Sequence, residues 1–278
     1  MFKKIAIVGV GLIGGSIGLA VKKKKLAKEV IGVARRESSK DKALKFKAVD
    51  KATLNLREAV KDAELVILAT PVAKIVEMAK DVIKCAQGGL ILTDVGSTKE
   101  LIVKEIERIA PSNVKFVGAH PMAGSEKSGV KFADSKLFNN SICIITKTKK
   151  TDDGAFNKVK TFWTKIGATC EILSPDKHDR YISFVSHLPH VAAVALTIAA
   201  ETDSLKYVSS GFKDTTRIAS SNPNLWKDIF ESNKEALLSS LHEYRAALEG
   251  IERSIKMGDS KTLIEHLEKA KKIRDKIK

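Results

Sequence analysis

Residues 2–20 read FKKIAIVGVGLIGGSIGLA, an apolar run rich in β-branched residues that breaks into the pattern G-x-G-x-x-G at Gly9, Gly11 and Gly14. When such a pattern joins a strand to a helix, the first glycine permits a tight turn and the second lets the backbone approach a pyrophosphate. The third lets the helix pack closely on the strand, and the N-terminus of the helix faces the phosphates. The stretch therefore predicts a dinucleotide-binding turn.

A membrane anchor and a secretory signal are the two other interpretations of this stretch. The uncharged run from Ile5 to Val21 has lysines on both sides, as a membrane anchor would. It is at the short limit for a membrane span, however, and its glycines are as typical of a dinucleotide turn as of a helix dimer. No small-residue cleavage site follows it, which argues against a secretory signal. We therefore expect no membrane partner.

The composition indicates a soluble globular protein with room for two domains. Of its 278 residues, 44% are hydrophobic, enough to fill two cores of ordinary size. The three cysteines, Cys85, Cys143 and Cys170, are widely spaced and form no CxxC pair. This argues against a disulfide framework or a zinc cluster and favours a reducing compartment, so we expect a cytoplasmic protein.

The formal net charge is +16, and lysine greatly exceeds arginine. Nucleic-acid binding would favour basic residues interleaved with aromatic ones, but aromatic residues make up only 5% and the lysines are scattered along the chain. We therefore expect a solvated lysine surface and no nucleic-acid partner. Its positive potential would still attract an anionic cofactor or substrate.

Apolar runs predict strands and helices in alternation through residue 173 and helices alone from Pro175 onward. This order indicates an α/β fold, a Rossmann-type doubly wound parallel sheet over residues 1–173 followed by an all-helical domain over residues 174–278. The last two predicted strands, 141–146 and 169–173, are expected to extend the same sheet. The earlier strands are expected at 5–8, 30–33, 65–69, 90–93 and 114–118, and the helices between strands at 55–63, 72–84, 99–109 and 156–165.

Two segments of the helical domain carry packing information. Residues 191–200, VAAVALTIAA, are apolar all round, which predicts a helix buried on every side. Farther on, apolar residues step by four and three positions, and such a seam packs against another helix, either in the same chain or in a second subunit. The seam residues are Leu237, Leu241, Tyr244, Leu248, Ile251 and Ile255.

The end of the second strand bears on the choice of dinucleotide. Ala34 stands where NAD-binding proteins carry an acid for the ribose 2′-hydroxyl, and Arg35 and Arg36 follow it. Two guanidinium groups suit a 2′-phosphate, so we expect NADP with NAD as the alternative, unless these arginines are merely exposed. The full set expected at the cofactor is Gly9, Gly11, Leu12, Ile13, Gly14, Ala34, Arg35, Arg36, Thr70, Pro71 and Ser97.

His120 is the strongest candidate for acid–base chemistry. It follows a buried strand at the edge of the sheet where the ligand is expected, and Pro121 restricts the backbone after it. A lone histidine is often structural, but an imidazole titrates near neutral pH and suits a general base. Ser97, at a neighbouring strand end, could donate a hydrogen bond to it, cap the next helix, or do both.

The segment His187-Leu188-Pro189-His190 places two imidazoles on adjacent turns of a helix. As metal ligands they lack a partner at ligand spacing, so hydrogen bonding to a substrate is the better functional interpretation. Asp179 lies about 16 Å from His190 along a straight helix axis. We therefore expect Asp179 at the rim of the site or in the site of a partner subunit.

Three further residues could contact a substrate. Arg217 can bind a carboxylate through two parallel hydrogen bonds, or form a surface ion pair with Asp214. Trp226 offers an apolar wall with one donor, or core packing. Gly211 opens the segment that contains Arg217.

At this point the chain resembles the prephenate/arogenate dehydrogenases of tyrosine biosynthesis. The resemblance covers essentially the whole chain and rests on five motifs. The first, the glycine motif, is weakly specific, and the last four together, in this order, are highly specific. The motifs are GVGLIGGSIG at 9–18, TDVGSTK at 93–99, HPMAGSE at 120–126, HDRYISFVSHLPH at 178–190 and GFKDTTRIASSNPNLW at 211–226.

The resemblance implies oxidative decarboxylation of prephenate or arogenate with NAD(P). It assigns His120, with Ser97, to the 4-hydroxyl proton while hydride leaves C4, and Arg217 to the ring carboxylate. It further implies a homodimer formed by the helical domain, with Asp179 acting across the interface, and a pocket gated by Glu126 and Asp179. The residues expected around the substrate are Ser125, Glu126, Asp179, His187, His190, Gly211, Arg217 and Trp226.

The chain departs from many members of this family at residues 34–36, where it resembles those that use NADP. The sequence does not separate prephenate from arogenate, and L-tyrosine is expected to inhibit, if at all, by competing at the active site. Another two-domain NAD(P)-dependent reductase, such as a 3-hydroxyacid dehydrogenase, is the alternative enzyme. A nucleotide-binding regulator or a nucleic-acid binder is the non-enzyme alternative, suggested by the charge of +16.

Overall fold

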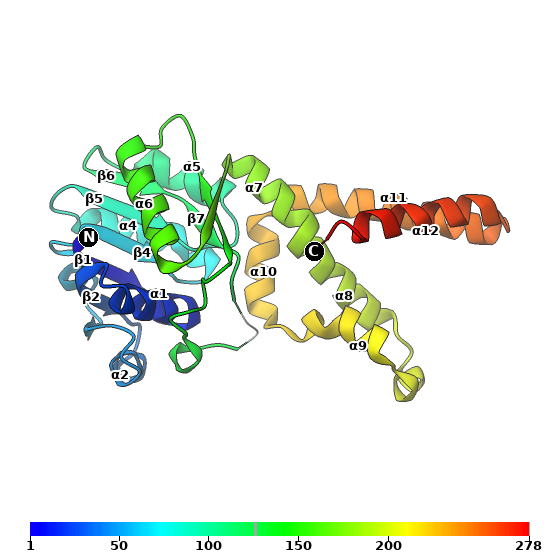
Figure 1. The fold of residues 1–278 in the computed structure, drawn as a ribbon, viewed down its shortest axis with the longest axis horizontal. Coiled ribbons are helices and arrows are strands. Elements are labelled where there is room, and N and C mark those ends of the chain that lie inside the picture. The colour runs from blue at the N-terminus through cyan, green and yellow to red at the C-terminus, as the bar shows by residue number, and fades with distance from the viewer. Residues whose placement is uncertain (125–126, 278) are drawn as a thin grey trace. The chain divides into compact units, whose positions relative to one another are not determined.

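The computed structural model describes residues 1–124 and 127–277, which form two compact units, Met1–Asn233 and Lys234–Lys278 (Figure 1). The first unit holds a six-stranded parallel sheet in the order β3-β2-β1-β4-β5-β6. This is the strand order of a doubly wound dinucleotide-binding fold, as the sequence predicts. The strands are β1 (Phe2–Val8), β2 (Ala27–Val33), β3 (Lys51–Thr53), β4 (Leu65–Leu68), β5 (Leu90–Asp94) and β6 (Val114–Val117).

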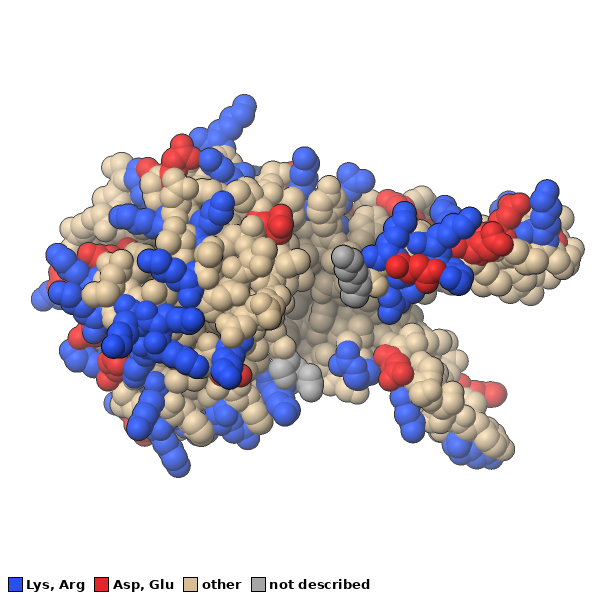
Figure 2. Space-filling view, viewed as in Figure 1, with Lys and Arg blue, Asp and Glu red and all other residues tan. Residues whose placement is uncertain are grey.

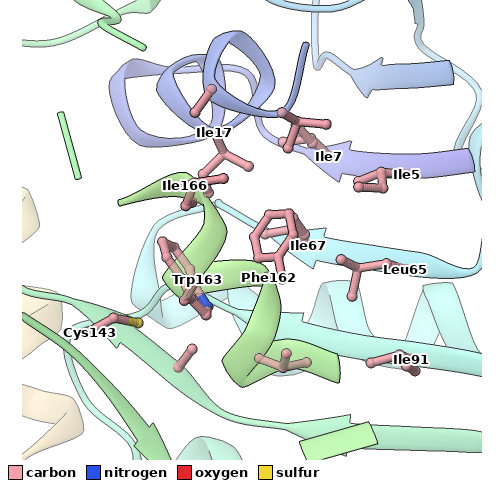
Figure 3. Packing of buried hydrophobic residues seen from close by; sticks show 14 of the residues in the cluster. Ile5, Ile7, Ile17, Leu65, Ile67, Ile91, Cys143, Phe162, Trp163 and Ile166 are labelled. Atoms are coloured by element: carbon pink, nitrogen blue, oxygen red, sulfur yellow. The ribbon is translucent and has the colours of Figure 1, made fainter. Parts of the chain in front are cut away.

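Helices cover both faces of this sheet because its central strands are apolar on both sides. Along β1, Ile5 and Ile7 pack with the buried side chains of α1 and α6, including Trp163 (Figure 3). The alternate residues Ala6 and Val8 pack with α3, α4 and α5. The helices are α1 (Leu12–Lys23), α2 (Glu37–Lys45), α3 (Leu56–Val60), α4 (Ile75–Cys85, preceded by the 3₁₀ turn η1, Val72–Lys74), α5 (Glu100–Ile109) and α6 (Asp153–Ile166).

The prediction that the last two strands extend this sheet is wrong. They form a separate sheet of three strands, β7 (Ala119–Pro121), β8 (Ile142–Thr146) and β9 (Thr169–Leu173), in which β7 is antiparallel to β8. The chain passes from β6 into β7 at Gly118, where a Cβ would lie 2.5 Å from the Thr146 hydroxyl. The close approach of Thr146 requires glycine at this bend, and the bend leads to His120 on β7.

From Pro175 the described chain is helical, as expected. The 25 residues Pro175–Ala199 are, by length and composition, apolar enough to cross a membrane. The prediction of burial on every side is wrong in the single chain, since Leu196 and Ile198 are 42% and 79% exposed. The elements are α7 (Pro175–Ile182), a π-helical turn η3 (Ser183–His187), α8 (Leu188–Ala199), η4 (Thr202–Tyr207), α9 (Ser210–Thr216), η5 (Arg217–Ser220), and α10 (Pro223–Ser232). A short 3₁₀ segment, η2 (Val130–Phe132), lies before β8.

The second unit is a helical hairpin of α11 (Lys234–Lys256) and α12 (Ser260–Arg274). The two helices pack against each other, which gives the predicted seam a partner in the same chain. Its residues Tyr244, Leu248 and Ile255 nevertheless stay exposed. The hairpin therefore leaves apolar surface uncovered in the single chain.

Basic side chains are spread over the visible face of the molecule and are interspersed with acidic ones (Figure 2). This distribution fits the expected lysine surface.

The glycine turn yields a stability prediction. A Cβ on Gly14 would lie 2.0 Å from the Gly9 carbonyl oxygen, so Gly14→Ala must push α1 away from β1. We expect a loss of about 1–3 kcal/mol in the free energy of unfolding, measured by urea denaturation. Gly88→Ala is the control, because nothing lies within 4 Å of its Cβ. Equal stability of the two variants would contradict the role assigned to Gly14.

Candidate active site

Two glycines of the turn are required by packing, and the third leaves space for a ligand. Gly9 has φ +97°, and its Cβ would lie 2.5 Å from the Ala69 carbonyl oxygen. Gly11 has nothing within 4 Å of its Cβ position and precedes α1 with no side-chain cap on the helix. The free N–H groups of the first turn, from Leu12 to Gly14, can therefore meet an anion over open space.

The adjoining strand end supplies a polar atom without a partner. The Thr70 hydroxyl is buried and has no hydrogen-bond partner among the described residues, and the Thr70 backbone N lies 3.2 Å from the Cβ position of Gly9. Pro71 follows and begins the turn into η1. The open space at Gly11 and the unsatisfied Thr70 hydroxyl fit a dinucleotide in this turn.

The end of β2 presents free cationic side chains. The buried Ala34 donates its N–H to the Thr53 carbonyl over 3.0 Å, whereas Arg35 and Arg36 are exposed just before α2. Within the described part of the chain, neither guanidinium forms an ion pair. Both are therefore available to an anionic group.

A buried ion pair joins the end of β5 to the start of α5. The Lys99 ammonium binds the Asp94 carboxylate, and both side chains are fully buried. Asp94 also accepts hydrogen bonds from the backbone N–H of Gly96, over 2.9 Å, and of Ala119, over 3.3 Å. These bonds offset the cost of burying the charge and tie the loop after β5 to the strand that carries His120.

His120 lies at one end of a buried chain of hydrogen bonds. Its Nδ1 is 2.9 Å from Nε2 of His178, and Nδ1 of His178 is 2.7 Å from Oδ1 of Asp179. His120 is 9% exposed, while His178 and Asp179 are 0% and 1% exposed. The His120 ring can therefore reach a ligand, whereas His178 and Asp179, which lie behind it, cannot.

Three expectations about this region are wrong. Asp179 is not at the rim, because its carboxylate accepts the backbone N–H groups of Lys99 and Glu100 over 2.7 and 2.8 Å. That carboxylate, from α7, occupies the capping place at the N-terminus of α5 where Ser97 was expected. Nor does Ser97 bond to His120, although both residues are described.

Burial keeps the histidines of this cluster neutral. Desolvation is the main cause that lowers the pKa of His120 well below its ordinary value of 6.5, and the neighbouring His178, Lys99 and His187 lower it further. Desolvation also lowers the pKa of His178 against the opposing effect of Asp179, and it lowers that of His187 to about 4. A neutral imidazole has a free lone pair and can act as a base at pH 7.

A second group of rings lies on α8 and α10. The His190 ring stacks on Trp226 with centroids 3.5 Å apart and planes 13° apart. His187 Nδ1 lies 3.1 Å from the Asn233 side-chain amide, which also donates to the Asp179 carbonyl. His187 Nε2 and His190 Nδ1 are buried without partners among the described residues. Buried nitrogens without a partner are candidates for hydrogen bonding to a polar ligand.

The remaining predicted residues vary in their placement. Arg217 begins η5 and is exposed, and it makes no ion pair with Asp214 although both are described. Gly211 is exposed in α9, with open space at its Cβ position. Ser125 and Glu126 lie outside the described residues, so their predicted roles stay predictions.

Four residues that form the hydrogen bonds and the ion pair of this site were not predicted from the sequence: Asp94, Lys99, His178 and Asn233. Asp94 and Lys99 lie in the TDVGSTK motif, and His178 precedes Asp179 in the HDR segment. The motifs therefore include these three residues, but their sequence does not indicate what the residues do. Lysine is rarely fully buried, and only the long-range contacts identify these residues.

The comparisons with known proteins agree with this arrangement. Residues 17–172 match the family described as "Prephenate dehydrogenase, nucleotide-binding domain", and residues 174–269 match "Prephenate dehydrogenase, dimerization domain". The chain is 37% identical to prephenate dehydrogenase of Bacillus subtilis, over 98% of this chain and 75% of that one. It is 32% identical to cyclohexadienyl dehydrogenase of Zymomonas mobilis, over 99% and 96%.

A solved structure extends the likeness to three dimensions. Prephenate dehydrogenase from A. aeolicus, in complex with hydroxyphenyl propionate and NAD+, has a TM-score of 0.94 and 33% identity. The match covers 100% of this chain and 99% of that one. With its doubly wound sheet, helical C-terminal part and both family domains in sequence, the chain belongs to the prephenate dehydrogenase family of oxidoreductases.

Proposed function

We propose that this chain catalyses the oxidative decarboxylation of prephenate or arogenate, with His120 as the general base. The observation that carries the proposal is the neutral, nearly buried His120 ring, held by His178 at the carboxyl-end edge of the sheet. The glycine turn opens at the same edge, because β1 and β6 run parallel. The names of the relatives support the substrate class.

In this proposal His120 takes the proton of the substrate 4-hydroxyl through Nε2, since Nδ1 is bonded to His178. A nicotinamide dinucleotide bound at the glycine turn supplies the acceptor for the hydride that leaves C4. The ring carboxylate then leaves as CO₂, and its bonding electrons complete the aromatic ring. His120 returns the proton to the same oxygen, so the residue ends the cycle neutral.

Arg217 is proposed to bind the ring carboxylate. Its guanidinium makes no ion pair in the described chain, and arginine binds carboxylates through two parallel hydrogen bonds. His187 and His190 offer unpartnered nitrogens for the rest of the substrate. If L-tyrosine inhibits, we propose that it competes with the substrate for this place.

We also propose a homodimer. The boundary between the nucleotide-binding and the helical domain is proposed between residues 173 and 174, because one family match ends at residue 172 and the other begins at residue 174. The exposed apolar residues of α8, α11 and α12, among them Ile198, Ile255 and Leu267, support contact of the helical part with a second copy of this chain.

Two substitutions separate the proposed roles. In an assay that follows the nicotinamide absorbance at 340 nm, we expect His120→Asn to lower kcat about 10³-fold with KM within about threefold. We expect Arg217→Ala to raise KM for prephenate about 100-fold with a smaller effect on kcat, because it removes substrate binding.

The matched controls are His242→Asn and Arg245→Ala, exposed residues on α11, which should keep the kinetic constants of the natural chain. The opposite pattern for His120 and Arg217 would overturn the role assignment. Absence of turnover by the unmodified chain, with either substrate and either cofactor, would overturn the proposed function.

The dinucleotide preference is proposed to be NADP, on the strength of the unpaired Arg35 and Arg36 at the end of β2. For the double variant Arg35→Ala/Arg36→Ala we expect kcat/KM for NADP to fall about 30-fold or more, and that for NAD to change by less than about threefold. Arg108→Ala, on α5, is the control. An equal loss with both cofactors would contradict the preference.

A further inference from the structure

His178 and Asp179 are too deeply buried to contact a substrate, yet they lie in line with the proposed base. His178 is 0% and Asp179 1% exposed, and the line runs from Asp179 through both rings to His120. The two imidazoles meet edge to face, with centroids 5.1 Å apart. Such an arrangement can determine where the protons lie on both rings.

The carboxylate fixes the first proton. Asp179 accepts two backbone N–H groups, from Lys99 and Glu100, an arrangement that stabilises a charged carboxylate. A charged carboxylate can only accept hydrogen bonds, so Nδ1 of His178 must carry the proton in the 2.7 Å contact with Oδ1.

The second proton follows from the first. Desolvation lowers the pKa of His178, so its ring carries one proton at pH 7, and that proton is on Nδ1. Nε2 of His178 therefore holds a lone pair and accepts from Nδ1 of His120 over 2.9 Å. Nε2 of His120 is then the unprotonated nitrogen.

We infer that His178 and Asp179 are positioning residues that hold His120 in the tautomer whose Nε2 accepts a proton. This inference rests on the proposed function for its catalytic consequence, but the tautomer itself can be observed without substrate. When His120 takes a proton, the hydrogen bond to His178 also links the new positive charge to the negative Asp179.

The charged groups around His120 are consistent with this role. The ammonium of Lys99 is neutralised by Asp94, and His187 is neutral because burial lowers its pKa to about 4. Asp179 is therefore the anion to which the rings are linked through hydrogen bonds in this cluster.

His178 gives the cleaner test, because Asp179 also caps α5 and its loss would disturb the fold. His178→Leu removes the acceptor for His120, whereas His178→Gln can place an amide oxygen near the position of Nε2. Histidine tautomers are read from the ¹⁵N resonances of both ring nitrogens in the full chain at pH 7. The same variants are assayed with prephenate at 340 nm.

In the unmodified chain we expect His120 to carry its proton on Nδ1. In His178→Leu we expect the proton to move to Nε2, kcat to fall about 100-fold or more, and KM to stay within about threefold. His178→Gln should keep the Nδ1 proton and recover at least tenfold in kcat over the leucine variant. Asp179→Asn should resemble the leucine variant, while Asp152→Asn, which alters the carboxylate that caps α6, should not.

An unchanged His120 tautomer in His178→Leu, or equal kcat in the leucine and glutamine variants, would overturn the inference. If the unmodified chain turns over neither substrate, the proposed function fails, and the ¹⁵N spectra still decide whether the two residues set the tautomer. If it turns over prephenate while the tautomer is insensitive to His178, only the inference fails.

Discussion

The carboxylate of Asp179 is the interaction on which the site depends. This side chain, on α7, accepts the N–H groups of Lys99 and Glu100 at the start of α5 and contacts His178. It therefore fixes the helical segment to the sheet domain within the first unit. Asn233 holds the backbone of the same residue through the Asp179 carbonyl. A negative charge at the N-terminus of a helix is favoured by the helix dipole, which helps to offset its burial. The position of the His120–His178 pair follows from this anchor.

The site combines neutral rings with one fully buried ion pair. Asp94 and Lys99 form this pair, and two backbone N–H groups, of Gly96 and Ala119, also donate to the Asp94 carboxylate. Removing one partner of such a pair typically costs about 3–5 kcal/mol, so the two residues are constrained together. His120 and His178 are also buried, and desolvation lowers the pKa of both, so these rings are neutral. Burial therefore leaves neutral rings at the place where the proposed substrate would bind.

Local sequence patterns were sufficient for much of the fold. The glycine turn and the alternation of parallel strands with helices depend on short-range sterics and on apolar runs, and both were predicted. The three-residue strands β3 and β7 are too short to show a period, and β7 decides that β8 and β9 form a second sheet. The burial of residues 191–200 could not be predicted from apolarity alone, because a helix that is apolar all round is also what a protein interface requires.

The candidate site was predicted where single residues reveal their chemistry, and those roles stay predictions. His120, His187, His190 and Arg217 carry groups whose chemistry is visible in the sequence. The capping of α5 by Asp179 was not predictable, because nearby Ser97 is a good local candidate and the actual cap lies about 80 residues away. The role of His178 depends on the same long-range contact. Proximity in the fold, rather than residue type, distinguishes these positioning groups from ordinary core residues.

The central claim is that His120 is a neutral base because the fold desolvates it. The most direct measurement is the titration of its ring by NMR in the full chain without ligands, with exposed His242 as the internal reference. The account predicts that His120 stays neutral at pH 6.5, where an ordinary imidazole is half protonated, and takes up its proton only at clearly lower pH. A His120 pKa at or above 6.5 would contradict it.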